Sequence, residues 1–171
     1  MKDIEDYIIS VKDFPKQGID FKDITPLLSS PEALELCLNE LYSKIKGESI
    51  DKVVGMESRG FFFATLLAQK LKAGFIPVRK PGKLPFDRIS ESFDLEYGTD
   101  VLEIHSDAIK PGERVLIHDD VLATGGTAAA TCKLVERLGG EIVQCNFIME
   151  LGFLNGRGKL PNYNIQSVLK Y

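Results

Sequence analysis

Two adjacent aspartates and a glycine-rich stretch stand together in the middle of the chain. The segment from Val115 to Thr127 reads VLIHDDVLATGGT, so a short apolar run is followed by Asp119 and Asp120 and then by small residues. Ionised carboxylates only accept hydrogen bonds, which suits a pair of vicinal hydroxyl groups. A turn of small residues lets backbone N–H groups approach a phosphate closely. We therefore expect this segment to bind a sugar phosphate.

The flanking residues predict the elements that hold this site. The apolar run 115–117 is typical of a buried strand in a parallel sheet, and Thr127 to Leu138 predicts a helix that stops at Gly139-Gly140. The acids then lie at the carboxyl end of the strand, where ligands of open α/β sheets bind. The helix N-terminus contributes unpaired N–H groups and a positive dipole end. The predicted phosphate ligands are Ala123, Thr124, Gly125, Gly126 and Thr127, while His118 is interpreted as a strand residue without catalytic consequence.

A second strand–loop–helix unit precedes the first. Lys52 to Met56 predicts a strand, the sequence Glu57-Ser58-Arg59-Gly60 a turn, and Phe61 to Leu71 a helix. The guanidinium of Arg59 is a fixed bidentate donor, and with the turn's N–H groups it could hold a diphosphate. Helix-entry charges are the alternative interpretation of the turn. Because the two strands should be neighbours, we expect the two loops to face one crevice.

The remaining pattern predicts one α/β domain over residues 1–171, with a parallel Rossmann-like sheet flanked by helices. Pro31 to Ile45 has helical spacing, and Phe75–Arg79, Val101–Ile104 and Glu141–Met149 are candidate strands. An amphipathic stretch at 4–11 precedes a turn-rich segment at 13–25. Periodicity lapses from Lys80 to Gly98, which predicts a long loop of the kind that covers active sites.

Composition limits the partners and the compartment. The net charge of −4 and the pI near 5.3 argue against nucleic acid as a partner. Three widely spaced cysteines indicate neither a disulfide framework nor a zinc site, and we expect reduced, mostly buried thiols. Acids near the N-terminus argue against a secretory signal, and no run of about 18 apolar residues suggests a membrane span. We expect a cytoplasmic protein. His105 and His118 have no triad-like context and are assigned no catalysis.

The central motif resembles the signature of the type I phosphoribosyltransferases, which bind 5-phosphoribosyl 1-diphosphate. It departs from the usual pattern at His118, where an aliphatic residue is usual. FPKQGIDFKDITPLL at 14–28, VRKPGKLP at 78–85 and LEYG at 95–98 extend the resemblance to the adenine-using branch over nearly the whole chain. The resemblance implies the type I phosphoribosyltransferase fold, with a small N-terminal hood at about 1–30 and a flexible catalytic lid at about 80–100.

The resemblance also implies a purine salvage reaction, in which adenine and 5-phosphoribosyl 1-diphosphate give AMP and diphosphate. It implies a Mg²⁺ ion bound mainly through diphosphate and ribose oxygens, no metal ligands from the protein itself, and a homodimer. The catalytic residues implied are Glu96, Arg59, Asp119 and Asp120, with Glu96 handling the adenine proton. Phe21 and Leu154 would cover the two faces of the base and Lys22 its edge. The other implied substrate-binding residues are Glu57, Ser58, Arg59, Gly60, Arg79, Lys80, Lys83 and Tyr97.

Several alternatives stay open on the sequence. Phe21 could be an ordinary core residue, and Glu96 one solvated acid among several. The base could be hypoxanthine, guanine, xanthine or orotate, because base choice depends on a few backbone contacts. A regulator could also keep this fold to sense phosphoribosyl diphosphate while binding DNA, although the acidic balance and the absence of a spare domain speak against that.

Overall fold

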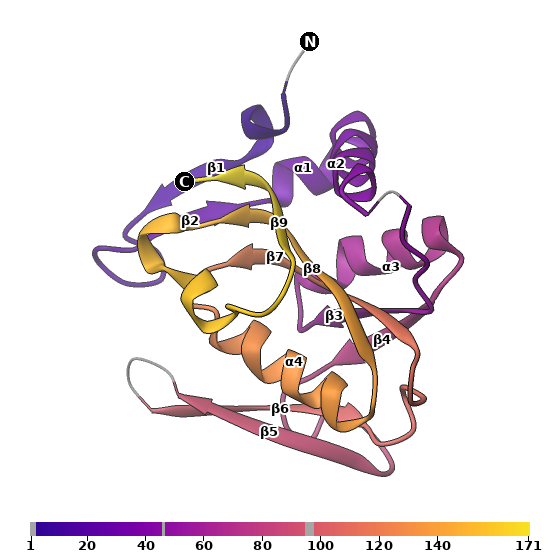
Figure 1. Cartoon of the computed structure of the whole chain (residues 1–171). Coiled ribbons are helices and arrows are strands. Elements are labelled where there is room, and N and C mark those ends of the chain that lie inside the picture. Colours follow the sequence, from indigo (N-terminus) through magenta and orange to yellow (C-terminus); the bar gives the residue numbers. More distant parts are fainter. Residues whose placement is uncertain (1–2, 46, 95–97) are drawn as a thin grey trace.

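A five-stranded parallel sheet forms the centre of the molecule. The computed structural model describes residues 3–45, 47–94 and 98–171. The sheet has the order β4-β3-β7-β8-β9, all neighbours parallel (Figure 1). Its strands are β3 (Lys52–Met56), β4 (Gly74–Val78), β7 (Arg114–Leu122), β8 (Glu141–Glu150) and β9 (Ile165–Lys170). Gly55 of β3 is paired with His118 of β7, so the two predicted loops follow adjacent strands, as expected.

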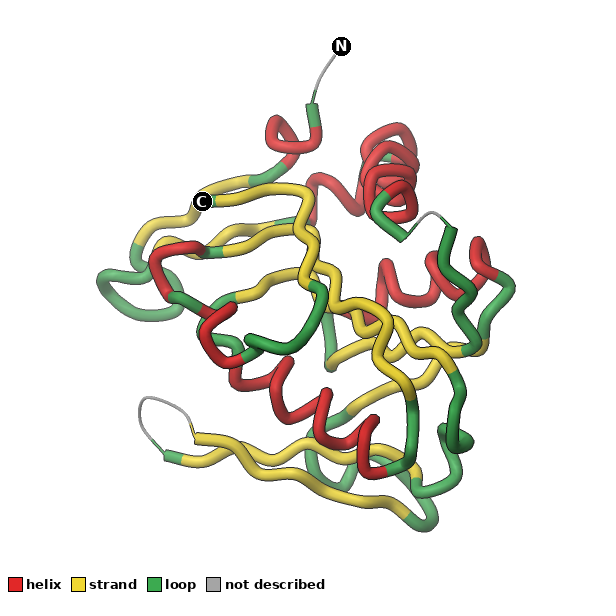
Figure 2. Tube along the Cα trace, viewed as in Figure 1, coloured by secondary structure: helices red, strands yellow, loops and turns green. Residues whose placement is uncertain are grey.

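Helices cover both faces of the sheet, and each buries an apolar stripe. One face packs against α1 (Thr25–Ser29), α2 (Pro31–Ser43), α3 (Gly60–Leu71) and the N-terminal 3-10 turn η1 (Ile4–Tyr7). The other face packs against α4 (Gly126–Arg137) (Figure 2). Helix α2 begins where the Ser30 hydroxyl accepts a hydrogen bond from the Ala33 N–H and Pro31 occupies the first turn. The predicted parallel sheet flanked by helices is confirmed.

The segment after β4 differs from the prediction. We expected an irregular loop from Lys80 to Gly98, but residues 88–94 form strand β5 (Arg88–Asp94), which pairs antiparallel with β6 (Thr99–His105). This hairpin lies against α4 on the side away from the sheet (Figure 1). Ile89 and Phe93 pack into the core beneath α4, and Glu91 forms ion pairs with cations of that helix. The burial of two side chains from one face of the strand explains why a regular hairpin forms here.

The N-terminal segment and the C-terminal segment meet at the carboxyl end of the sheet. Strands β1 (Ile9–Lys12) and β2 (Asp20–Asp23) form an antiparallel hairpin, although only turns were expected at 13–25. The short 3-10 turns η2 (Gly152–Leu154) and η3 (Gly156–Lys159) follow β8 near this hairpin (Figure 1). The β1–β2 hairpin and these 3-10 turns together border the carboxyl ends of β7 and β8 (Figure 1).

Strand β7 extends further than predicted. We expected the strand to end at the acids, but pairing with β8 continues from Asp119↔Phe147 to Leu122↔Glu150. Asp119 and Asp120 therefore lie within a strand and project to opposite sides of it. This fixes both carboxylates on a rigid element instead of a loop.

Strand β7 also carries a buried histidine. His118 is 0% exposed, and its Nδ1 lies 2.7 Å from Oδ1 of Asn146, the residue opposite it on β8. Burial lowers the pKa of His118 from 6.5 to about 4 although the bond to Asn146 opposes the shift. The prediction that His118 is a strand residue agrees with this placement.

The depressed pKa of His118 predicts acid-sensitive folding. The unfolded chain takes up a proton at this imidazole below about pH 6.5, whereas the folded chain takes it up only near pH 4. The free energy of unfolding is therefore at its full value above pH 6.5 and falls as the pH drops towards 4. Between pH 7 and pH 5 this group should remove about 2 kcal/mol from the free energy of unfolding. Urea unfolding at both pH values should show a smaller loss in His118→Gln and an unchanged loss in His105→Gln. An equal loss in all three proteins would contradict the assignment.

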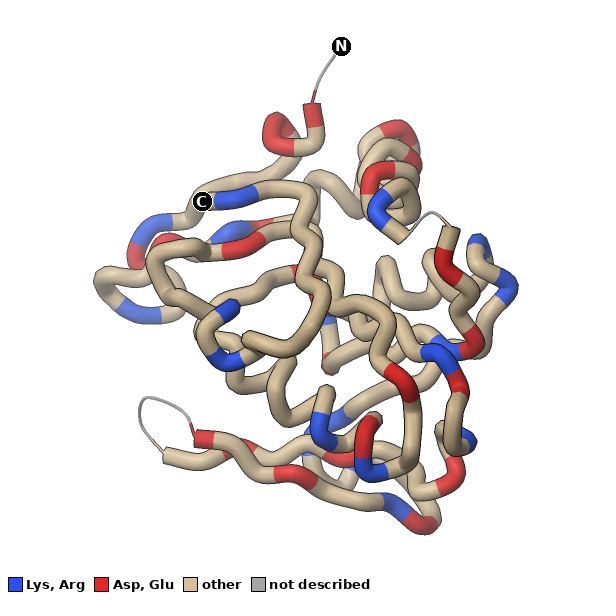
Figure 3. The backbone as a smooth tube through the Cα atoms, in the orientation of Figure 1, with Lys and Arg blue, Asp and Glu red and all other residues tan. Residues whose placement is uncertain are grey.

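Charged residues of both signs occur along most of the chain (Figure 3). The β5–β6 hairpin is mainly acidic, with Arg88 set against Glu91, Asp94, Asp100 and Glu103 (Figure 3). Within the described ranges, no helix combines the length and apolar character that crossing a bilayer requires.

Candidate active site

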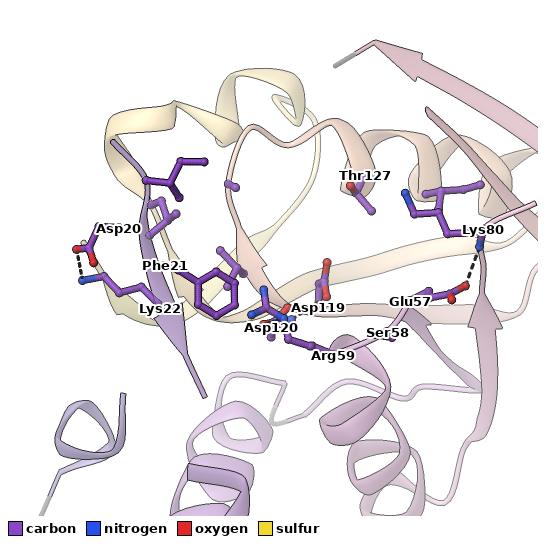
Figure 4. A pocket seen from close by; sticks show the side chains of 15 residues that line it. Asp20, Phe21, Lys22, Glu57, Ser58, Arg59, Lys80, Asp119, Asp120 and Thr127 are labelled. Carbon is purple, nitrogen blue, oxygen red and sulfur yellow. Dashed lines mark hydrogen bonds and ion pairs between the residues drawn. The ribbon is translucent and has the colours of Figure 1, made fainter. Parts of the chain in front are cut away.

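A crevice of about 510 Å³ opens at the carboxyl ends of β3 and β7. The hood contributes Phe21 on one side, Thr127 and Lys80 lie on the other, and the acid pair lies between them (Figure 4). The residues that line it are Ile19, Asp20, Phe21, Lys22, Glu57, Ser58, Arg59, Lys80, Leu102, Asp119, Asp120, Val121, Ala123, Thr127 and Leu151. Ten of these fifteen were predicted as site residues, so two distant motifs and the hood meet in one cavity.

The turn before α4 forms a smaller cavity of about 60 Å³ beside the crevice. Gly125 precedes the helix with φ of 78°, in the left-handed region, and no side chain caps the helix N-terminus. The first N–H groups of α4 are therefore left for a ligand. Asp119 and Thr127 line both cavities, so the turn and the acid pair share one site. The arrangement suits an anion held next to a sugar.

The two acids have different surroundings. Asp120 is 3% exposed, whereas Asp119 is half-buried and accepts a hydrogen bond of 2.9 Å from the Asp120 N–H. Burial and the adjacent negative charge of Asp120 raise the pKa of Asp119 well above its usual range. Burial also raises the pKa of Asp120, against the opposing charge of Arg59. A ligand that donates hydroxyl hydrogens here would relieve the cost of burying these carboxylates.

Arg59 links the acid pair to the hood. Its Nε lies 2.9 Å from Oδ2 of Asp120, and its guanidinium carbon lies 4.7 Å from the centre of the Phe21 ring. The ion pair lacks the alignment of a hydrogen bond, so Asp120 Oδ2 and Arg59 Nη1 are buried without hydrogen-bond partners in the described part of the chain. Both residues line the crevice, and unsatisfied buried polar atoms beside a crevice indicate a site for a polar ligand.

Glu57 is held by the two residues that directly follow β4. It accepts hydrogen bonds from the Lys80 N–H at 2.8 Å and from Nε and Nη2 of Arg79 at 3.2 and 3.3 Å. Partial burial works against the charge, but these donors outweigh it and lower the pKa of Glu57. The Glu57–Ser58 peptide bond is cis. The Lys80 ammonium forms an ion pair with Asp100 of β6 and lines the crevice.

Gly60 brings the two loops into direct contact. A Cβ at this position would lie 2.7 Å from Oδ1 of Asp119 and 3.1 Å from both the Asp119 Cα and the His118 carbonyl oxygen. Only glycine fits between helix α3 and strand β7 here, because backbone atoms cannot move aside cheaply. The packing of Gly60 therefore sets the position of the Asp119 carboxylate.

Replacing Gly60 by Ala should displace Asp119 and weaken use of the sugar-phosphate substrate. A misplacement of a few tenths of an ångström at a positioned carboxylate predicts a rise in KM of roughly fivefold. Gly74→Ala is the matched control, since its Cβ would meet only the flexible Lys52 side chain. Steady-state kinetics of both variants tests this, and equal behaviour of the two would mean that Gly60 does not position the acid.

Several predicted residues lie elsewhere or outside the described part. Leu154 is 39% exposed and is not among the lining residues, whereas Leu151 lines the crevice. Arg79 donates hydrogen bonds to the Glu57 carboxylate, and Lys83 lies in the exposed turn that follows Lys80. Glu96 and Tyr97 lie outside the described residues. Sequence reasoning missed Ile19, Leu102, Val121 and Leu151, whose apolar side chains carry no specific chemical signal, and Asp20, a carboxylate in the turn-rich N-terminal segment.

The carboxylates of the crevice offer hard oxygen atoms, but few of them. Across residues 3–45, 47–94 and 98–171, no three side chains of His, Cys, Asp or Glu gather as a metal cluster would. Asp119 and Asp120 are hard donors that suit Mg²⁺ or its water ligands, and the buried Oδ2 of Asp120 lacks a hydrogen bond. The donor set fits an ion that keeps most of its ligands from water and substrate.

Comparison with known proteins identifies the class. The family model described as the phosphoribosyl transferase domain matches residues 25–168, and the chain belongs to this family. Its fold is the type I phosphoribosyltransferase fold. Adenine phosphoribosyltransferases are its close relatives: the Flavobacterium johnsoniae enzyme is 69% identical over 168 residues, covering 98% of this chain and 99% of the relative.

Solved structures of adenine phosphoribosyltransferases superpose closely on this chain. Adenine phosphoribosyltransferase from Rhodothermus marinus is 55% identical with a TM-score of 0.95, over 98% of this chain and 96% of that one. The Saccharomyces cerevisiae enzyme, solved with an imino-altritol bisphosphate and adenine, is 40% identical with a TM-score of 0.92, over 97% and 96% of the two chains. The resemblance inferred from the central motif and the hood is thereby confirmed.

Proposed function

We propose that this chain transfers the 5-phosphoribosyl group of 5-phosphoribosyl 1-diphosphate to adenine, giving AMP and diphosphate in purine salvage. The observation that carries the proposal is the meeting of an acid pair, an open helix N-terminus and an aromatic hood residue in one crevice. Relatives named adenine phosphoribosyltransferase at 50% identity and above support adenine as the base.

Each part of the crevice has a role in this proposal. The N–H groups of 123–127 and the hydroxyls of Thr124 and Thr127 bind the 5′-phosphate, and Asp119 and Asp120 accept hydrogen bonds from the ribose hydroxyls. These contacts hold the anomeric carbon in place while the leaving group departs. The carboxylates also offset the positive charge that develops on the ribose ring.

The two ends of the substrate are held by different loops. The turn 57–60, with Arg59 and Lys80, neutralises the charge that collects on diphosphate as the glycosidic bond breaks. Arg79 and Lys83 add positive charge beside Glu57. On the hood side Phe21 packs on the purine ring and the backbone of Lys22 reads its edge, with Leu154 assigned to the opposite face when the site closes.

Mg²⁺ is the proposed cofactor and would supply charge neutralisation at the diphosphate. Asp119 and Asp120 would hold it through water and ribose oxygens, in keeping with the small number of protein carboxylates at the crevice. The chain's own residues bind and orient the sugar whether or not they touch the ion.

Glu96 is proposed as the group that handles the adenine proton, with Tyr97 beside it as a substrate contact. Glu96→Gln should lower kcat while both KM values stay near wild type, because only the proton transfer is lost. Asp94→Asn, at an exposed acid at the end of β5, is the control. Steady-state kinetics decides, and a wild-type kcat in Glu96→Gln would remove the residue from the mechanism.

We also propose a homodimer in the cytoplasm. The family resemblance supports the dimer, and Phe62 of α3, which is 48% exposed, is one apolar side chain that a second copy could cover. The three cysteines are free thiols, and the sulfurs of Cys132 and Cys145 lie 3.7 Å apart without a bond, the state that a reducing compartment maintains. Sedimentation equilibrium should give twice the chain mass of 19.0 kDa, and a single-chain mass would contradict the dimer.

A base panel tests the proposed reaction. The protein is incubated with Mg²⁺, 5-phosphoribosyl 1-diphosphate and, in separate reactions, adenine, hypoxanthine, guanine, xanthine and orotate. We expect AMP from adenine and only trace product from the other bases. A different nucleotide as the main product would change the base assignment, and the absence of any nucleotide would refute the enzymatic proposal.

A further inference from the structure

The turn that we assign to the 5′-phosphate is braced from outside by a second glycine turn. A Cβ on Gly125 would lie 2.4 Å from the Gly156 carbonyl oxygen, and a Cβ on Gly156 would lie 2.3 Å from the Ala123 carbonyl oxygen. The two backbones therefore touch with no side chain between them. Gly156 is buried and begins η3, which contacts α4. The shape of the phosphate turn depends on where η3 is held.

An ion pair ties η3 to the sheet at the next residue. Arg157 Nε donates to Glu150 Oε1 at 2.6 Å and Nη2 to Oε2 at 2.9 Å, while Nη1 donates to the Ile165 carbonyl oxygen at 3.2 Å. The Ser167 hydroxyl donates to Glu150 Oε2 at 3.1 Å. Arg157 is thus attached to the end of β8 and the start of β9 by three directional bonds, and the planar guanidinium fixes its orientation.

The Arg157–Glu150 ion pair lies next to β7, the strand that carries Asp119 and Asp120. Glu150 is the last residue of β8, is 7% exposed, and stands opposite Leu122, the last residue of β7. The bond from Arg157 is the main reason that the pKa of Glu150 lies below its ordinary value, with burial opposing it. Burying a carboxylate contributes little net stability even when it is paired, so such a pair is better explained by the position that it specifies.

We propose that Arg157 and Glu150 are positioning residues for the 5′-phosphate, which fix Gly156 against Gly125 and thereby shape the turn 123–127. The inference rests on the phosphate-binding role proposed above for that turn. Neither Arg157 nor Glu150 is among the residues that line the crevice or the small cavity, so they act through η3 and not by contact with substrate.

The test compares binding of a phosphate probe with catalysis. Ribose 5-phosphate is titrated calorimetrically into wild type, Arg157→Met, Arg157→Lys and Glu150→Gln, and KM for 5-phosphoribosyl 1-diphosphate and for adenine is measured alongside. We expect the ribose 5-phosphate Kd and the KM for the diphosphate substrate to rise about tenfold in Arg157→Met, with adenine KM within twofold. Arg157→Lys should recover part of the loss, because lysine keeps the charge but not the three-bond geometry.

A matched ion pair at the other end of the sheet serves as the control. Arg114 at the start of β7 pairs with Glu48 and Glu141 at 2.5 and 2.9 Å, far along the strand from the acids. Arg114→Met should leave both constants unchanged even where it lowers the melting temperature. A melting temperature lowered in both variants with an unchanged ribose 5-phosphate Kd in Arg157→Met would show that Arg157 is structural only, and would overturn the proposal.

Ser167→Ala keeps the proposal testable where Arg157→Met does not fold. It removes one hydrogen bond from Glu150, and we expect a two- to threefold rise in the ribose 5-phosphate Kd, whereas wild-type Kd values in both Ser167→Ala and Arg157→Lys would refute the positioning role. The calorimetric readout needs no turnover. Failure of wild type to make AMP would therefore count against the proposed reaction. An unaltered Kd in the variants would count only against the positioning role of Arg157 and Glu150.

Discussion

Asp120→Asn should reduce kcat/KM for 5-phosphoribosyl 1-diphosphate by about 10²-fold. The substitution removes the carboxylate charge at the oxygens that we propose accept a hydrogen bond from a ribose hydroxyl. It also leaves Arg59, whose Nε lies 2.9 Å from Asp120 Oδ2, without its ion-pair partner. Removing one partner of a largely buried charge pair costs about 3 kcal/mol, which corresponds to this loss in rate. Initial rates at limiting diphosphate substrate measure the effect.

The control for this prediction is an acid of the same type far from the crevice. Asp107 is exposed on the turn after β6, and Asp107→Asn should retain wild-type kinetics. Circular dichroism of Asp120→Asn should match wild type, which separates a binding defect from unfolding. Wild-type kinetics in a folded Asp120→Asn protein would eliminate the ribose-clamp role of the acid pair.

Gly125→Ala should have a comparably large effect on the same kinetic constant, together with a loss of stability. The new Cβ would lie 2.4 Å from the Gly156 carbonyl oxygen, and φ of 78° adds about 1 kcal/mol of strain for an L-residue. Relief requires a backbone shift that costs roughly a further 1–3 kcal/mol and moves the N–H groups that we propose bind phosphate. We expect kcat/KM for the diphosphate substrate to fall about 10²-fold.

Gly112→Ala isolates the steric part of that prediction. Gly112 has φ of 83° and no atom within 4 Å of an added Cβ, so it carries the same backbone strain without the clash. Its variant should lose about 1 kcal/mol of stability by urea unfolding and keep wild-type kinetics. Equal kinetic behaviour of the two alanine variants would indicate that close packing of the turn is irrelevant to substrate binding.

The central motif was predictable because its chemistry is local. Strand, acids, glycine turn and helix follow one another within about twenty residues, and the pairing of β3 with β7 brings the turn 57–60 alongside. The same residues could not reveal that Arg59 contacts Phe21, because that contact depends on how the N-terminal hairpin folds over the sheet. Leu151 and Ile19 reach the crevice by the same tertiary packing.

The errors in the fold have similar physical causes. Strand β5 reads RISESFD, in which Glu91 lies on the same side as Ile89 and Phe93 and hides the alternation. That glutamate is tolerated because it forms ion pairs with Lys133 and Arg137 of α4. The strand is therefore stabilised by a helix forty residues further along the chain. Strands β2 and β9 are short and have no clear pattern of their own. They are defined only by their pairing, β2 with β1 across a turn and β9 with β8.

A crystal structure of the protein with bound AMP is the measurement that tests the central claim most directly, namely that one crevice holds both ends of the product. We expect the phosphate within hydrogen-bond distance of the N–H groups of 123–127, the ribose hydroxyls at Asp119 and Asp120, and the adenine ring against Phe21. A phosphate bound away from the turn before α4, or a ribose that does not contact the acid pair, would contradict the account.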